Sequence, residues 1–215
     1  MKTKHLAIAA AALVVSGSAA VAADINATYT DRASFLAAIG ASVDFDFESS
    51  ALSGTASSGA ASSIDFGDFA VGSSPAAVKV LGVPAIGASN TTPGGANYMY
   101  LDTDIAFTGA VTTFTFDSTL TAFGFNYTSL APGAGAATIT VGSIVTIVPS
   151  GSSGFFGFTS DGFASFAFDS SDDSAVGFDD LAWAEAGAVS DVPAPAAAPL
   201  LLLGLGGLAA LRRRG

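Results

Sequence analysis

The chain reads Val111-Thr112-Thr113-Phe114-Thr115-Phe116 and then Ala122-Phe123-Gly124-Phe125-Asn126-Tyr127, with apolar residues at every second position. This period of two is typical of a β-strand that has one face on a core and the other in water. Residues 43–48 repeat the pattern with acidic residues on the wet face, and residues 163–168 repeat it with small ones. The sequence therefore predicts strands over these ranges.

Further alternating or apolar stretches extend the prediction to most of the chain between residues 24 and 185. They lie at 64–71, 78–83, 98–107, 139–148 and 176–183. Segments rich in Gly, Pro and Ser separate them, at 53–59, 92–95, 131–135 and 149–154. About nine or ten short strands with such breaks predict an all-β fold, a β-sandwich or jelly roll.

One segment, residues 30–40, has a helical pattern instead. Thr30 or Asp31 is suited to cap its start, alanines fill its interior and Gly40 is suited to end it. Phe35, Leu36 and Ile39 would share one face. We expect a single short helix that covers one end of the sandwich. The 17 phenylalanines of the chain, mostly at alternate positions, are expected to fill its core rather than to form a sugar-stacking platform.

Charge is distributed unevenly along the 215 residues. The formal net charge is −11, but residues 24–191 hold all 18 acidic residues and only two basic ones, Arg32 and Lys79, which gives this segment −16. Such a surface repels phosphate backbones, so the sequence excludes nucleic acid as a partner.

Two residue types needed for common catalytic and metal sites are scarce. The chain has no Cys, which excludes disulfides, thiol nucleophiles and thiolate metal sites. Its only His is His5, in a segment that we expect to be removed. The remaining body therefore lacks the residues of a Ser-His-Asp or Cys-His mechanism and of a typical zinc site.

The N-terminus has the three parts of a secretory signal peptide. Basic residues at Lys2 and Lys4 precede an apolar run at 6–15, and small residues follow up to Ala23. This order predicts export and cleavage after Ala23 by signal peptidase.

The C-terminus also has three parts. They are the motif Val192, Pro193, Ala194 and Pro195, an apolar stretch at 196–211, and the cluster Arg212, Arg213 and Arg214. The stretch is apolar all round, which favours a membrane helix over a helix packed on the body. The arginines predict a cytoplasmic end, so the body would lie on the far side of the membrane.

This tail resembles the PEP-CTERM protein-sorting domain, in particular its Val-Pro-Leu-Pro-Ala variant. Ala194 stands where the variant has Leu and the name-giving motif has Glu. The resemblance implies an exosortase-type membrane protease as partner, a transient inner-membrane anchor and release to the surface or matrix of a Gram-negative bacterium that makes exopolysaccharide. In addition, residues 176–183 are similar to the closing strand of many jelly-roll carbohydrate-binding domains.

The sequence thus predicts a signal peptide at 1–23, an extracellular β-sandwich domain at 24–188 and a sorting signal at 189–215. The predicted function is that of a non-enzymatic cell-surface or exopolysaccharide-matrix protein without a required cofactor, delivered by the export machinery and exosortase.

Two other functions stay open. A Ca²⁺-dependent carbohydrate-binding module would hold the ion with Asp102, Asp104, Asp179 and Asp180, because calcium prefers six to eight oxygen ligands. Tyr98, Tyr100 or Trp183 would stack on the sugar. A glycosidase would need two carboxylic acids across a cleft, for which the only glutamates are Glu48 and Glu185.

Overall fold

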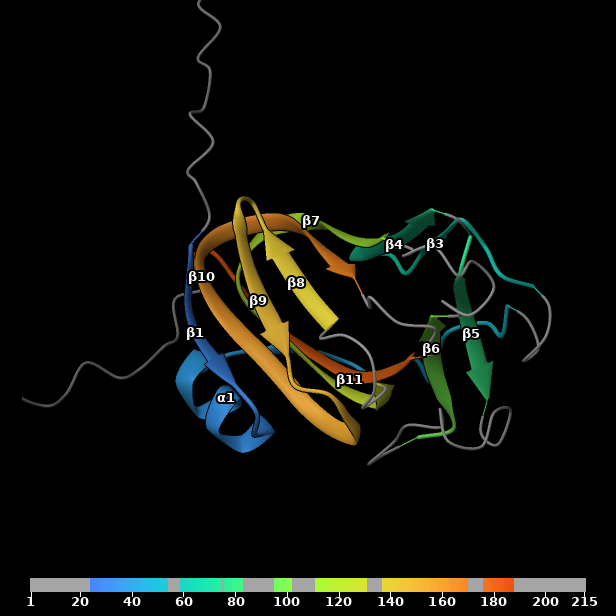
Figure 1. Cartoon of the computed structure of the whole chain (residues 1–215), viewed down its shortest axis with the longest axis horizontal. Coiled ribbons are helices and arrows are strands. Elements are labelled where there is room, and N and C mark those ends of the chain that lie inside the picture. Colours follow the sequence, from blue (N-terminus) through green and yellow to red (C-terminus); the bar gives the residue numbers. More distant parts are fainter. Residues whose placement is uncertain are drawn as a thin grey trace, which may run out of the picture.

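The computed structural model describes residues 24–53, 59–74, 76–82, 95–101, 111–130, 137–169 and 176–187, which form eleven strands and one helix (Figure 1). The elements are β1 (Ile25–Tyr29), α1 (Arg32–Ile39), β2 (Val43–Phe45), β3 (Ser63–Asp65), β4 (Phe69–Ser74), β5 (Val78–Gly82), β6 (Asn97–Leu101), β7 (Val111–Leu130), β8 (Ala137–Val141), β9 (Ile144–Val148), β10 (Gly151–Asp169) and β11 (Val176–Glu185). The predicted all-β class with one short helix is confirmed.

All strands join in one antiparallel sheet, whose main order is β5-β6-β11-β7-β10-β8-β9. Two strands are far longer than predicted, at 20 residues for β7 and 19 for β10. The first half of β7 pairs with β4 and its second half with β11. Likewise β10 pairs with β1 through its first half and with β8 through its last residues.

The sheet folds over on itself because β7 and β10 bend. The register between them shifts twice between Thr159 and Ser165, where strand pairing is interrupted, and both ribbons curve strongly (Figure 1). The result is sandwich-like, with the two halves of the same long strands in opposite layers. A single sheet therefore replaces the two separate sheets of a sandwich.

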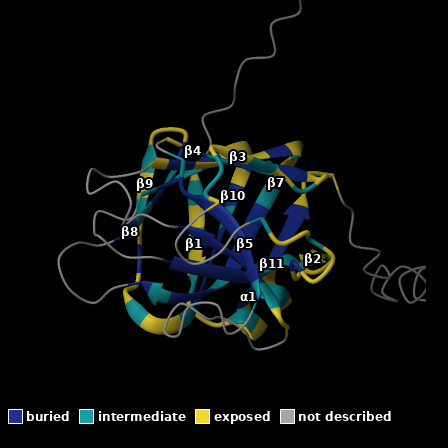
Figure 2. Cartoon of the chain, turned by 90° about the vertical axis from the view of Figure 1, so that its right-hand side faces the viewer, coloured by how far each residue is buried: buried dark blue, intermediate teal, exposed yellow. Residues whose placement is uncertain are grey.

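The space between the layers is filled by aromatic side chains. Among the described residues, twelve buried phenylalanines belong to this core, and many lie ring against ring, as in the stacked pair Phe114 and Phe166 with centroids 4.6 Å apart. Trp183 lies in the same core against Phe69 and Phe116. Figure 2 shows the buried stretches of β5 and β11 in the middle of the body. The prediction that phenylalanine supplies the core is confirmed for these residues.

Helix α1 follows the predicted capping pattern. The carboxylate of Asp31 accepts a hydrogen bond from the backbone N–H of Ser34 at 2.8 Å, and this bond holds the pKa of Asp31 below its usual value. Gly40 ends the helix at φ 74°, which a residue with a Cβ rarely adopts. Phe35 is fully buried, with Leu36 and Ile39 packed around it as predicted.

The helix packs where the sheet carries glycine. A Cβ at Gly124 of β7 or Gly157 of β10 would come within 3 Å of the ring of Phe35. Glycine at these two positions therefore lets the Phe35 ring pack directly on the backbone of the outer face of the sheet.

The predicted strand boundaries differ from the structure in several places. Residues 64–71 form the antiparallel pair β3 and β4 rather than one strand, because the chain turns between Asp65 and Phe69. Residues 139–148 form a hairpin rather than one strand, because Gly142 takes φ 59° and starts a two-residue turn between Val141 and Ile144. Residues 151–154 are not a break but the start of β10, since their backbone pairs with β7. Strand β1 was not predicted.

Candidate functional site

The closing strand β11 contains a bulge at its two adjacent aspartates. Asp179 lies opposite Asn126 of β7 and Ala182 opposite Gly124, so β11 has one residue more than its partner over this stretch. Asp180 takes φ 46°, and its N–H donates to the Asp179 carboxylate at 2.8 Å. Both aspartates thus hold the local backbone geometry.

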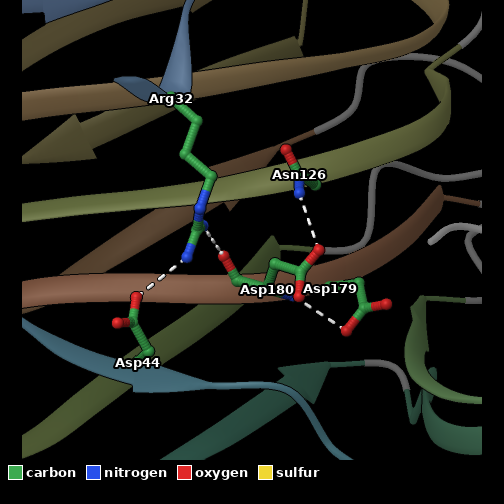
Figure 3. A network of polar contacts seen from close by, with 5 residues as sticks. All are labelled: Arg32, Asp44, Asn126, Asp179 and Asp180. Atoms are coloured by element: carbon green, nitrogen blue, oxygen red, sulfur yellow. Dashed lines mark hydrogen bonds and ion pairs between the residues drawn. The ribbon is translucent and has the colours of Figure 1, made fainter. Parts of the chain in front are cut away.

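A polar network surrounds this bulge (Figure 3). The side-chain amide of Asn126 donates to the Asp180 carboxylate at 2.9 Å. Arg32 of α1 donates to the backbone carbonyl of Asp180 and forms an ion pair with Asp44 of β2 at 2.8 Å. Because Asp44 is 61% exposed, the ion pair is screened by water and contributes little to stability. The network joins α1, β2, β7 and β11 at one place.

The predicted calcium site involves two of these residues. Asp102 and Asp104 lie outside the described residues, so the set of four carboxylates stays a prediction. Within the described ranges, no group of three or more His, Cys, Asp or Glu side chains is placed to hold a metal ion. Asp179 is 1% exposed, while Asp180 accepts from Asn126.

The predicted sugar-stacking residues are buried, so that prediction is wrong. Tyr98 is 0%, Tyr100 4% and Trp183 2% exposed, which leaves no ring face for a sugar. The prediction failed because both faces of β6 are covered: Met99 belongs to the main core, while Tyr98 and Tyr100 pack with Leu81 on the opposite side. Burial raises the pKa of Tyr98 to about 12.

Lys79 of β5 shares this second buried face and was not singled out in the sequence. It is 0% exposed, and its ammonium lies 5.6 Å from the ring centroid of Tyr100. The sequence signal for this site was a lysine within an otherwise apolar strand. A charged side chain is seldom fully buried without a specific partner, so such a lysine indicates a partner in the fold.

The two glutamates considered for glycoside hydrolysis both accept hydrogen bonds from other segments of the chain. One Glu48 carboxylate oxygen accepts from the backbone N–H groups of Ala96 and Asn97, at 2.6 and 2.8 Å. Glu185 accepts from the hydroxyl of Ser118 at 2.9 Å. Glu48 therefore anchors the start of β6, a role that sequence reasoning missed because 48 residues separate the partners.

A pocket of about 280 Å³ opens beside β2, β3 and β5. Its residues combine aromatic and aliphatic side chains with hydroxyls and one carboxylate: Phe45, Ser49, Ser50, Ala51, Ile64, Asp65, Phe66 and Val80. The Asp65 carboxylate accepts from the N–H of Gly67 at 2.9 Å, which holds it in an Asx turn at the rim. This composition suits a small neutral ligand that has both C–H and O–H groups.

The sorting residues Val192–Pro195 and Arg212–Arg214 lie outside the described residues, as do the predicted signal peptide and the apolar stretch 196–211. In the part of the chain that the structure describes, no helix combines the length and hydropathy of a membrane span.

No family model matches the chain, and no characterised protein matches it in sequence. Among solved structures it is similar to the K2 cleaved adhesin domain of Lys-gingipain (Kgp), at 13% identity and a TM-score of 0.43, over 66% of this chain and 99% of that one. A likeness this weak establishes neither a common fold nor a common function. The resemblance of the tail to the PEP-CTERM sorting domain stays a prediction.

Proposed function

We propose that the protein is an exported, non-enzymatic β-domain of the cell surface or exopolysaccharide matrix, sorted through its C-terminal tail. The observation that carries this proposal is the order of segments in the sequence: a signal-like start, a segment 24–191 of charge −16, and a motif followed by an apolar stretch and three arginines. The first described strand begins at Ile25, two residues after the expected cut, and the last ends at Glu185, before the motif.

The acidic side chains support a structural role for the body. Asp31 caps α1, Asp65 closes a turn, Glu48 anchors β6, and the Asp179-Asp180 pair stabilises the bulge of β11. All of these carboxylates except that of Asp180 accept hydrogen bonds from backbone N–H groups, and Asp180 accepts from the side-chain amide of Asn126. The remaining negative charge keeps a protein with a phenylalanine core soluble.

Mass spectrometry of the extracellular fraction of an exopolysaccharide-producing Gram-negative host with an exosortase tests the sorting. We expect mature protein that begins at Asp24 and ends near residues 192–195. Replacing Pro193 and Pro195 by Ala should leave the protein in the membrane fraction, while Pro149→Ala in the body serves as the matched control. Secreted protein that still ends at Gly215 would disprove the processing step.

The pocket favours a second candidate function, binding of a neutral saccharide of the matrix. The rings of Phe45 and Phe66 and the side chain of Ile64 offer C–H contacts, while Ser49 and Asp65 offer hydrogen bonds to hydroxyls. The Ca²⁺-dependent form of this function remains a proposal that requires Asp102 and Asp104 as well.

Retention on immobilised exopolysaccharide tests this second function. Ala51→Trp should fill the pocket and reduce retention at least about tenfold. A tenfold change in affinity corresponds to the binding free energy of roughly one good contact with the saccharide. Leu52→Trp is the matched control, because Leu52 is exposed next to Ala51 and does not line the pocket. Equal retention of both variants, or none by the wild type, would eliminate the pocket as a glycan site.

A further inference from the structure

Strand β9 is the last strand of the sheet order and has an unpaired edge within the described part of the chain. It pairs there only with β8, in a ladder that runs from Val141 opposite Ile144 to Ala137 opposite Val148. Its side chains Val145 and Ile147 are 60% and 64% exposed, the highest values among the large exposed hydrophobics of the described residues. The edge of the sheet is therefore both apolar and open.

The backbone groups at this edge belong to the same two residues. The pair that flanks a two-residue turn is hydrogen-bonded, and bonded and non-bonded pairs then alternate along an antiparallel ladder. With Val141 opposite Ile144, the residues Val145 and Ile147 fall in non-bonded pairs. Their N–H and C=O groups are consequently directed away from β8, toward the open edge.

This edge lacks the usual protection against strand pairing. Natural edge strands carry charges, prolines or bulges, whereas the hairpin 137–148 contains no charged residue and no proline, and its register is regular. Residues 24–191 carry a net charge of −16, and within them this hairpin is uncharged. Two acidic copies of the chain would meet there with the least repulsion.

We propose that β9 pairs with β9 of a second copy of this chain, antiparallel about a two-fold axis at Thr146. Val145 then lies opposite Ile147 of the partner subunit, and Ile147 opposite Val145 of the partner subunit. Each of these pairs exchanges two hydrogen bonds through the outward-directed groups, and the exposed side chains of the pair come into contact. The edge is thus complementary to itself, as a two-fold contact requires.

Contact through one short strand is small, so the association is reversible and depends on concentration. Sedimentation velocity of the full chain from about 10 µM to about 1 mM, the range of weak contacts, should show a shift from monomer to dimer. Ile147→Lys should abolish the shift. Leu52→Lys is the matched control, because Leu52 is 59% exposed and lies beside Gly82 of β5, at the opposite end of the sheet order from β9.

Cross-linking tests the register itself, since the chain has no Cys of its own. In the two-fold arrangement Thr146 faces its own copy at about 4.5 Å between Cα atoms, within the range of a disulfide. Under a mild oxidant, Thr146→Cys should form disulfide dimers many-fold faster than Ser143→Cys at the exposed hairpin turn. A monomer at all concentrations, equal cross-linking of the two variants, or loss of the dimer in Leu52→Lys would each overturn the proposal.

Discussion

Phe178 and Leu181 both lie in the main core. Because they are three positions apart and side chains alternate between faces, a regular strand would direct them to opposite faces of the sheet. The bulge at Asp179 and Asp180 adds the residue that restores their common direction. The adjacent acidic residues that suggested a metal site thus have a structural role, since they let β11 contribute to the core on both sides of the bulge.

The positive φ of Asp180 predicts a ranking of substitutions. Asp180→Asn should be close to wild type, because Asn tolerates this conformation and keeps an acceptor for Asn126. Asp180→Val should be less stable than Asp180→Gly by about 1–2 kcal/mol, because a β-branched residue is disfavoured at positive φ. Urea unfolding measures the three values, and equal stability of the Val and Gly variants would contradict the bulge geometry.

Glu48 and Gly95 should behave as one unit. Glu48→Ala removes the acceptor of two backbone N–H groups and should cost about 1 kcal/mol. A Cβ at Gly95 would overlap the Glu48 carboxylate, so Gly95→Ala should displace it at a similar cost. In a double-mutant cycle the two losses should not add, and full additivity would contradict the predicted coupling.

The phenylalanine core predicts large losses on truncation. Phe166→Ala removes a ring that is 3% exposed and stacked on Phe114, and should cost about 3–5 kcal/mol in the free energy of unfolding. Leu52→Ala, at an exposed site, should change it by less than about 0.5 kcal/mol. A loss under about 1 kcal/mol for Phe166→Ala would be inconsistent with its burial.

The burial of Tyr98 predicts late ionisation of its phenol. The pKa rises from 10.0 to about 12 in the folded state because burial disfavours the charged form. The neutral phenol therefore stabilises the fold fully below pH 10, and this contribution is lost as the pH rises from 10 toward 12. Alkaline titration followed by phenolate absorbance should show a late component that Tyr98→Phe reduces, and the late ionisation that remains belongs to Tyr127, whose pKa burial also raises. A Tyr98 that titrates near pH 10 in the folded protein would restore it as an exposed sugar contact.

Calcium should stabilise the protein no more than sodium at equal ionic strength. Screening of the charge of −16 raises the melting temperature with either salt, whereas a specific site adds about 2.7 kcal/mol at a hundredfold excess over Kd. Thermal unfolding in CaCl₂ and NaCl, for the wild type and Asp179→Asn, separates the two effects. A calcium-specific gain that Asp179→Asn abolishes would establish the Ca²⁺-dependent alternative.

Local patterns were sufficient for several elements of the fold. The Asp31 and Gly40 caps of α1 act over one helical turn, and the alternation in β7 and β10 follows from the two faces of any half-buried strand. Such features depend on neighbours within a few residues, which a sequence displays directly. The phenylalanine core follows in the same way from the strong burial preference of that side chain.

The site features depended on contacts between distant segments. Alternation in β6 showed that Tyr98 and Tyr100 share a face, but not that this face is covered as well. Three contacts join residues far apart in the chain. They are the hydrogen bonds from Ala96 and Asn97 to Glu48, the packing of Phe35 on Gly157, and the hydrogen bond from Asn126 to Asp180 at the bulge. Residue types and spacing specify which face a side chain takes, whereas burial and partners on that face arise only when the sheet folds over on itself.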